Sequence, residues 1–222
     1  MTTTMPCGCV NQDVAEFGVK RCVAKCITHW MHSMMDRERP ELYYSRLDSS
    51  DNGNDPRVAE LFGTLHIPDA SPGDRCLEVG CGCSPYVGAL RLRGYQYVGT
   101  DSCRWAVDWM NRTYGKGTAF RVPVESSQPS NVSMILACHV LEHVVDPMLV
   151  LSNLRNTLLS GGRLVVLVPD DRDLTNPDHL WFFNVDGLQK MITAAGFTVT
   201  EIHQKSIVKH EDFIFCTALR GA

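Results

Sequence analysis

The chain contains a glycine turn at a position that favours ligand binding by the backbone. The turn reads Gly80-Cys81-Gly82 and ends an apolar segment that is predicted to be a strand. Glycines let a tight turn form and let a ligand approach the main chain, and the helix expected next offers free N–H groups. Asp101 ends the following apolar segment, where a carboxylate can accept hydrogen bonds from both hydroxyls of a ribose. These residues predict a nucleoside site, although a tight strand-to-helix turn alone would also account for the glycines.

The carboxylate of Glu78, just before the glycine turn, distinguishes between two nucleoside cofactors. The fingerprint of a dinucleotide such as NAD has a third glycine at position 85, which lets the following helix pack closely, and the chain has Pro85 there. A negative charge at Glu78 would repel a pyrophosphate. The same charge suits the amino group and sulfonium of S-adenosylmethionine. The residues therefore favour S-adenosylmethionine over NAD.

Three ionisable residues, His139, Glu142 and His143, follow the most apolar segment at spacings of three and four. In a helical turn they would share one face. His143 is a candidate general base, since an unperturbed imidazole has a pKa of about 6.5. Alternatively the three side chains could hold a metal ion, or Glu142 and His143 could cap and brace the loop. A metal site would need a fourth ligand or a water as well, and we predict no metal.

His179 is the second candidate base. It lies in an aromatic run with Trp181, Phe182 and Phe183. Such a run either shapes an apolar substrate pocket or packs a helix onto the sheet. The sequence leaves these two interpretations open.

Four cysteines near the N-terminus, Cys7, Cys9, Cys22 and Cys26, suggest zinc as an alternative. However, Cys22 and Cys26 fall on the apolar side of an amphipathic helix predicted over residues 19–36. The spacing fits no usual zinc module. We therefore expect these cysteines to pack in the protein interior.

The elements that must position these residues alternate along the chain from residue 74. Strands are predicted at 75–79, 95–100, 118–122, 132–138 and 163–168, with helices at 85–93, 147–159 and 185–195 and another that contains residues 105, 107, 109 and 110. A short helix at 57–65 precedes them, and an antiparallel pair at 197–203 and 212–219 follows them. This alternation predicts parallel βαβ units and an open α/β sheet. Ligands bind at the carboxyl ends of such strands, where the candidate residues fall.

Composition limits the classes of function. A chain of 222 residues suits one core, which we divide into an N-terminal helical cap or lid with a linker (1–55) and a catalytic domain (56–222). The net charge of −4 argues against a protein that binds nucleic acid by neutralising phosphates. Neither a signal peptide nor an apolar segment long enough for a membrane is seen. We expect a cytoplasmic monomer or homodimer that makes no membrane contact.

Taken together, Glu78-x-Gly80-x-Gly82, Asp101 and the run at 139–147 resemble a class I S-adenosylmethionine-dependent methyltransferase. The resemblance extends over roughly residues 74–219 and is strongest to the small-molecule branch that includes the ubiquinone and menaquinone biosynthesis enzymes. It implies a Rossmann-like seven-stranded sheet in the order 3-2-1-4-5-7-6, with the last strand antiparallel. The ubiquinone enzymes can carry a carboxylate–carboxylate–histidine metal cluster where this chain begins with a histidine.

The resemblance also implies which residues bind the cofactor S-adenosylmethionine. Ser84 stands where the family has a third loop glycine, and Glu125 lies one position after the family's acidic residue that meets adenine. Val132-Ser133 replaces the Phe-Asp that commonly opens the fourth strand. The expected cofactor-binding residues are Glu78, Gly80, Cys81, Gly82, Asp101, Ser102, Glu125 and His139.

The predicted function is transfer of a methyl group to an oxygen, or a nitrogen, of a small metabolite. Catalysis would come mainly from positioning, because the sulfonium is already a good leaving group. His143 or His179 would deprotonate an oxygen acceptor. Three alternatives remain: a methyltransferase that modifies protein side chains, a regulator that binds S-adenosylmethionine without turnover, and an NAD-linked oxidoreductase.

Overall fold

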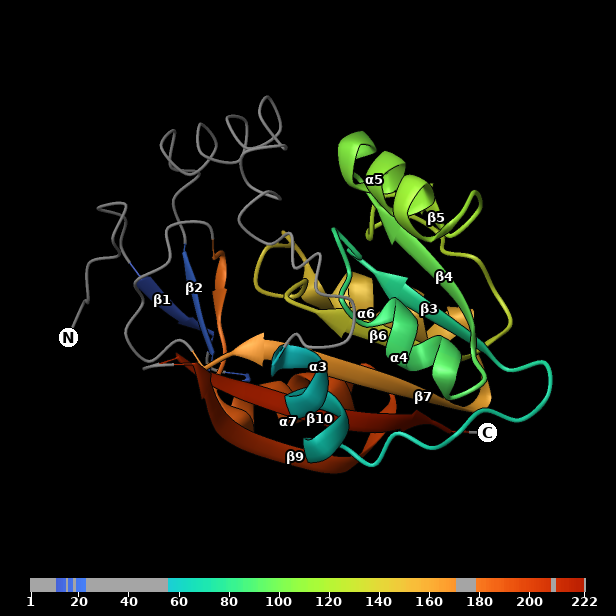
Figure 1. Ribbon diagram of the computed structural model, residues 1–222. Coiled ribbons are helices and arrows are strands. Elements are labelled where there is room, and N and C mark those ends of the chain that lie inside the picture. The colour runs from blue at the N-terminus through green and yellow to red at the C-terminus, as the bar shows by residue number, and fades with distance from the viewer. Residues whose placement is uncertain are drawn as a thin grey trace.

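The computed structural model describes residues 11–14, 16–17, 19–22, 56–170, 179–208 and 211–221 (Figure 1). Its main element is a seven-stranded sheet in the order β5-β4-β3-β6-β7-β10-β9. Numbered along the chain within this sheet, that is the predicted order 3-2-1-4-5-7-6, which is confirmed. The strands are β3 (Arg75–Val79), β4 (Gln96–Asp101), β5 (Ala119–Arg121), β6 (Val132–Cys138), β7 (Leu158–Pro169), β9 (Phe197–Val208) and β10 (Glu211–Arg220).

The strands β5, β4, β3, β6 and β7 run parallel to one another. Strand β10 runs antiparallel to both of its neighbours, as the family resemblance predicts. The central strand β6 is apolar and buried over nearly its whole length, which is the pattern of a strand covered on both faces. The carboxyl ends of β3, β4 and β6 therefore meet at one edge of the sheet.

Helices cover both faces of the sheet, as expected for parallel βαβ units. Within the described ranges the helices are α3 (Pro56–Thr64), α4 (Val87–Leu92), α5 (Arg104–Tyr114), α6 (Pro147–Thr157) and α7 (Val185–Ala194). Successive side chains of β3 enter different cores, because a strand alternates its faces. Leu77 and Val79 pack with α6 and α7, whereas Cys76 packs with α3, α4 and α5. The strand that ends in the glycine turn is thus held from both sides.

The predicted start of β7 is wrong, and so is the predicted end of β9, which continues from residue 203 to Val208. Helix α6 ends at Thr157 and not at Leu159, and residues 160–162 belong to β7. Leu158 takes an extended conformation and pairs with Val132, and the register then shifts before Met134 pairs with Arg163. Gly161, at a φ of 73°, lies in this irregular stretch. The glycines that predicted a helix stop therefore allow an irregular strand entry.

A second, three-stranded sheet consists of β1 (Asn11–Val14), β2 (Val19–Cys22) and β8 (Trp181–Phe182). The helix predicted over residues 19–36 is wrong at residues 19–22, which form β2. This short segment pairs with both β1 and β8, and such tertiary pairing overrides a weak local helical pattern. Residues 23–36, like Cys7, Cys9 and Cys26, lie outside the described residues.

Candidate functional site

The turn after β3 has a backbone that requires glycine. Gly80 and Gly82 have φ values of 61° and 49°, in the left-handed region that side chains disfavour. A Cβ atom added to Gly80 would lie only 2.7 Å from Cγ2 of Val140. The glycine turn thus packs directly against the loop that follows β6.

Asp101 connects the glycine turn to the end of β4. Its Oδ2 accepts a hydrogen bond from the Gly82 N–H at 2.9 Å, and its Oδ1 accepts one from the Cys103 N–H at 2.7 Å. The side chain is buried, and burial raises its pKa, an effect that the N–H groups of Cys103, Gly82 and Ser102 oppose. Each carboxylate oxygen has a second lone pair. Asp101 can therefore hold the turn and still accept hydrogen bonds from a ligand.

The carboxylate of Glu78 lies at the end of β3 and is almost fully buried. Its Oε2 accepts hydrogen bonds from the hydroxyls of Ser84 and Tyr97, each at 2.6 Å. Burial raises the pKa of Glu78 to about 7, although the two hydrogen bonds act in the opposite direction. The structure therefore places a carboxylate of adjustable charge beside the glycine turn.

Ser84 and Tyr97 were not assigned these contacts from the sequence. Ser84 replaces a glycine of the family pattern, and its Oγ also accepts a hydrogen bond from the Tyr86 N–H at 3.1 Å. Tyr97 lies on the neighbouring strand β4. Pairing of β3 with β4 brings its hydroxyl to Glu78, a contact that becomes visible only once the strand order is known.

Three further residues expected to bind the cofactor, Cys81, Ser102 and Glu125, differ in how far their side chains are exposed. The N–H of Cys81 donates to the Thr100 carbonyl at 3.0 Å, and its sulfur packs so closely on β4 that a Cβ at Gly99 would lie 2.8 Å away. Ser102 and Glu125 are exposed. Both the N–H and the thiol of Cys81 are therefore engaged with β4.

The loop after β5 is fixed by Gln128, which the sequence analysis did not single out. Its Oε1 accepts a hydrogen bond from the Thr100 hydroxyl at 2.9 Å, and its Nε2 donates to the Pro123 carbonyl at 2.8 Å. The side chain is buried. Gln128 thus anchors the segment that contains Glu125 to the end of β4.

His139 is the first residue after β6 and has a φ of 55°, an uncommon value for a residue with a side chain. Its N–H donates to the Leu167 carbonyl at 2.9 Å. Its Nδ1 lies 3.3 Å from Oε1 of Glu142. The segment is a turn and not a helix, but it still brings these two side chains together.

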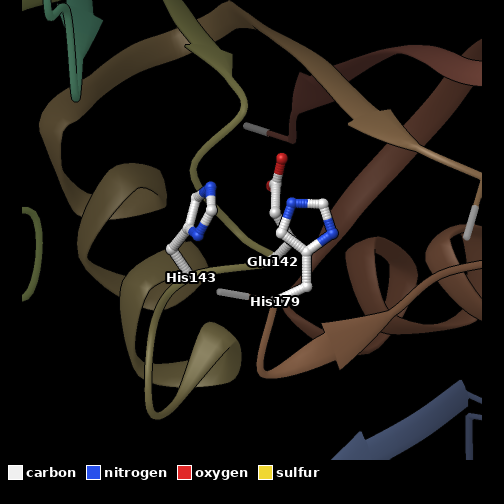
Figure 2. Close-up of side chains that lie close together, drawn as sticks. All are labelled: Glu142, His143 and His179. Carbon is white, nitrogen blue, oxygen red and sulfur yellow. The ribbon is translucent and has the colours of Figure 1, made fainter. Parts of the chain in front are cut away.

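Glu142, His143 and His179 form a second group, shown in Figure 2. Their ligating atoms all lie within 4.8 Å of one another. The two imidazole rings are 4.9 Å apart, centre to centre, in an edge-to-face arrangement. Glu142 and His179 are buried, whereas His143 is exposed. The two candidate bases are therefore neighbours, and His143 provides the accessible side.

Backbone hydrogen bonds explain why residues far apart in the chain meet here. The carbonyl of Glu142 accepts from the N–H groups of Leu180, at 2.7 Å, and Trp181, at 3.2 Å. The indole Nε1–H of Trp181 donates to the Val144 carbonyl at 2.9 Å. These bonds join the turn after β6 to the start of β8 and so place His179 beside Glu142.

The aromatic run that ends this segment packs in the interior. Trp181, Phe182 and Phe183 are all buried, and Trp181 and Phe183 belong to the core with α6 and α7. Of the two interpretations that the sequence left open, packing describes these three rings.

The charge of Glu142 is controlled by the histidines around it. Burial alone would raise the pKa of this carboxyl group, but His139, His143 and His179 together outweigh burial, and the net shift is downward. Glu142 is therefore a buried carboxylate held in its charged form by imidazoles.

No helix of the described residues is long and apolar enough to cross a membrane.

A family model described as a methyltransferase domain matches residues 51–202, well over half of the chain. Among curated proteins, an uncharacterised 37.1 kDa protein of a Streptomyces fradiae transposon is 30% identical over 122 residues. The match spans 50% of this chain and 34% of that protein. The chain therefore corresponds to about a third of that relative's length.

Solved structures with a similar fold include two methyltransferases. One is the 1,6-didemethyltoxoflavin-N1-methyltransferase of Burkholderia thailandensis with bound 1,6-didemethyltoxoflavin and S-adenosylhomocysteine, at a TM-score of 0.68 and 16% identity, covering 92% of this chain and 95% of that one. The other is the magnesium protoporphyrin IX methyltransferase of Synechocystis with bound S-adenosylmethionine, at a TM-score of 0.56 and 17% identity, covering 74% and 76%. At these identities the likeness concerns the fold.

Proposed function

The chain belongs to the methyltransferase-domain family, and we propose that it transfers a methyl group from S-adenosylmethionine to an oxygen, or a nitrogen, of a small organic molecule. The observation that carries this proposal is the position of two buried carboxylates next to the left-handed glycine turn: Glu78 precedes the turn, and Asp101 accepts a hydrogen bond from Gly82 within it. A turn of this kind suits a ligand that carries positive charge next to a ribose.

The chain's residues fit this cofactor. Asp101 is fixed by the N–H of Gly82 and can accept ribose hydroxyls through its remaining lone pairs. Glu78 offers a carboxylate for the amino group, oriented by Ser84 and Tyr97. When bound, S-adenosylmethionine supplies an electrophilic methyl group on a sulfonium that is ready to leave. The protein's task is to align an acceptor with that methyl group and exclude water.

The acceptor belongs beside the turn after β6, near His143 and His179. That turn contacts the glycine turn through Val140 and Gly80, so the two sites adjoin. A neutral imidazole of either histidine can accept the proton of a hydroxyl acceptor. The acceptor oxygen then forms the new bond to carbon, and the C–S bond breaks with its electron pair left on sulfur. A neutral amine acceptor needs no base before attack.

An acceptor screen tests this function. The protein is incubated with S-adenosylmethionine and a panel of phenols, alcohols and amines, and S-adenosylhomocysteine formation and product mass are measured. We expect transfer to one small-molecule class, with kcat for an oxygen acceptor lowered about 10²–10⁴-fold in His143→Ala. The control is His66→Ala, which removes an exposed histidine that pairs with Glu201 and does not belong to the group of Glu142, His143 and His179.

Two outcomes would contradict the proposal. Transfer to protein side chains alone would assign the fold to protein methylation. Cofactor binding with no turnover on any acceptor would indicate a regulator, in line with the Val132-Ser133 departure in β6.

A further inference from the structure

We propose that Glu142, His143 and His179 form a binding site for a divalent transition-metal ion of the zinc type. The three ligating atoms come from two segments and lie within 4.8 Å of one another (Figure 2). The sequence predicted no metal, and its metal alternative used His139 with Glu142 and His143. The structure brings in His179 instead, which no local spacing could connect to Glu142.

The state of Glu142 is the second observation that points to a cation. Its side chain is fully buried, and neither carboxylate oxygen accepts a hydrogen bond of good geometry from a described residue. Nδ1 of His139 lies 3.3 Å from Oε1, and the imidazoles of His143 and His179 are the other polar groups described near the carboxylate. A buried carboxylate without hydrogen bonds is costly, and such groups are normally paired or bound to metal. A cation between Glu142 and the imidazoles would supply the missing partner.

The geometry suits a catalytic rather than a closed structural site. A tetrahedral ion with bonds of about 2.1 Å holds its ligand atoms roughly 3.4 Å apart, so atoms that lie up to 4.8 Å apart must converge by up to about 1.4 Å. The exposed ring of His143 can make this adjustment. Three protein ligands leave a fourth position open, and His143 marks the accessible side.

The donor set also selects the metal. Two imidazoles and one carboxylate suit Zn²⁺, Co²⁺ and similar ions, whereas Mg²⁺ prefers oxygen ligands. His139, which contacts the carboxylate of Glu142, would orient this ligand without binding the ion itself. The site is therefore expected to discriminate strongly against Mg²⁺.

The role of the ion rests on the proposed function. An acceptor hydroxyl that binds at the open position loses its proton more easily, because a bound cation lowers the pKa of a coordinated oxygen. The proton leaves to solvent, the oxygen attacks the methyl carbon, and the C–S bond breaks. The products are the methylated acceptor, S-adenosylhomocysteine and one proton. With the ion bound, the histidines are ligands, and only in the metal-free protein can they act as bases.

The test titrates the full chain with Zn²⁺ and Co²⁺ after treatment with a chelator, by calorimetry and by visible absorption of Co²⁺. We expect binding of one ion, with Co²⁺ spectra that lack the thiolate charge-transfer band of cysteine ligation. His143→Ala and His179→Ala should weaken Zn²⁺ binding by about 100-fold or more, and His139→Ala by about 10-fold. Since His143 is exposed, its variant is expected to fold.

The matched control is His203→Ala. His203 and His66 flank Glu201 on the surface, at 3.9 Å and 3.0 Å, and so form another group of two histidines and a carboxylate. Because this surface group is not the proposed site, His203→Ala should leave the affinity for Zn²⁺ unchanged. Absence of Zn²⁺ binding in the wild type, unchanged binding in His143→Ala, or a thiolate band for Co²⁺ would each overturn the proposal.

A titration of the same samples with S-adenosylmethionine separates this inference from the proposed function. If the protein binds S-adenosylmethionine but fails to bind Zn²⁺, the metal site alone is overturned. If the protein binds Zn²⁺ in a way that depends on His143 and His179 but fails to bind S-adenosylmethionine, the metal site is supported and the proposed function is contradicted.

Discussion

Gly80 and Val140 are in such close contact that the glycine has no room for a side chain. A Cβ at Gly80 would lie 2.7 Å from Cγ2 of Val140, and the backbone there has a φ of 61°. This contact joins the turn after β3, proposed to bind the cofactor, to the turn after β6, which leads to Glu142 and His143. The two halves of the proposed site are thus one packed unit.

Gly80→Ala should therefore both destabilise the fold and weaken S-adenosylmethionine binding. The left-handed conformation alone costs an alanine about 1–2 kcal/mol, and the contact with Val140 adds to this. Chemical unfolding measures the loss. Adding Val140→Ala should restore part of the stability by removing the contact, while the cost of the backbone conformation stays.

The control for this experiment is Gly88→Ala. Gly88 lies exposed in helix α4 with nothing within 4 Å of an added Cβ. Alanine is there expected to stabilise the protein by about 0.5–1 kcal/mol. Equal effects of the two substitutions would show that the turn after β3 is not constrained by Val140.

Glu78 should make the stability of the ligand-free protein depend on pH. Burial raises its pKa from 4.5 to about 7 in the folded protein, so folding favours the protonated form. The stabilisation is complete below pH 4.5 and is lost as the pH rises through about 7. The loss amounts to about 3 kcal/mol relative to Glu78→Gln, which cannot titrate. Unfolding free energies of both proteins between pH 4.5 and 8 measure it.

The same carboxylate should make cofactor binding depend on pH in the opposite sense. A positively charged amino group favours ionised Glu78, so the affinity for S-adenosylmethionine should rise about tenfold from pH 6 to pH 8. In Glu78→Gln the affinity should be lower and should lose this increase. An affinity that is flat with pH in the wild type would remove Glu78 from the cofactor's charged end.

Trp181 should hold the segment of His179 in place. Trp181→Phe keeps most of the ring but leaves the Val144 carbonyl without the indole N–H, so we expect a loss of about 1–3 kcal/mol in unfolding free energy. Trp109→Phe is the control, since Trp109 is only half-buried on α5 and contacts Tyr114 edge to face. Trp109→Phe should lower the unfolding free energy clearly less than Trp181→Phe does. Similar losses in both variants would contradict an anchoring role for the indole.

The strands of the sheet could be predicted from the sequence because each is marked by a local pattern of apolar residues and turn residues. Strands β3 and β6 were predicted with the bounds that the structure has, since both are apolar runs ended by a turn. Residues 19–22 were mispredicted as helix because they take their structure from pairing with β1 and β8. A spacing rule cannot anticipate a partner that lies so far along the chain.

The same reason separates the predicted from the unpredicted parts of the site. Glu78, Gly82 and Asp101 lie where βα turns must fall, so their neighbourhood followed from strand order. The bonds of Tyr97 to Glu78 and of Gln128 to Thr100 need the three-dimensional pairing of strands. The meeting of His179 with Glu142 depends on the hydrogen bond from Leu180, which no sequence pattern marks.

The most direct test is a calorimetric titration with S-adenosylmethionine, S-adenosylhomocysteine and NADH. The wild type is compared with Asp101→Asn and with Asp108→Asn, an exposed aspartate on α5 that pairs with Arg104 at 3.7 Å. We predict binding of the first two ligands and not of NADH, with affinity lowered at least about tenfold in Asp101→Asn, the equivalent of about 1.4 kcal/mol. Asp108→Asn should bind as the wild type does. Binding of NADH alone, or equal affinity for S-adenosylmethionine in Asp101→Asn and the wild type, would contradict the proposed cofactor site.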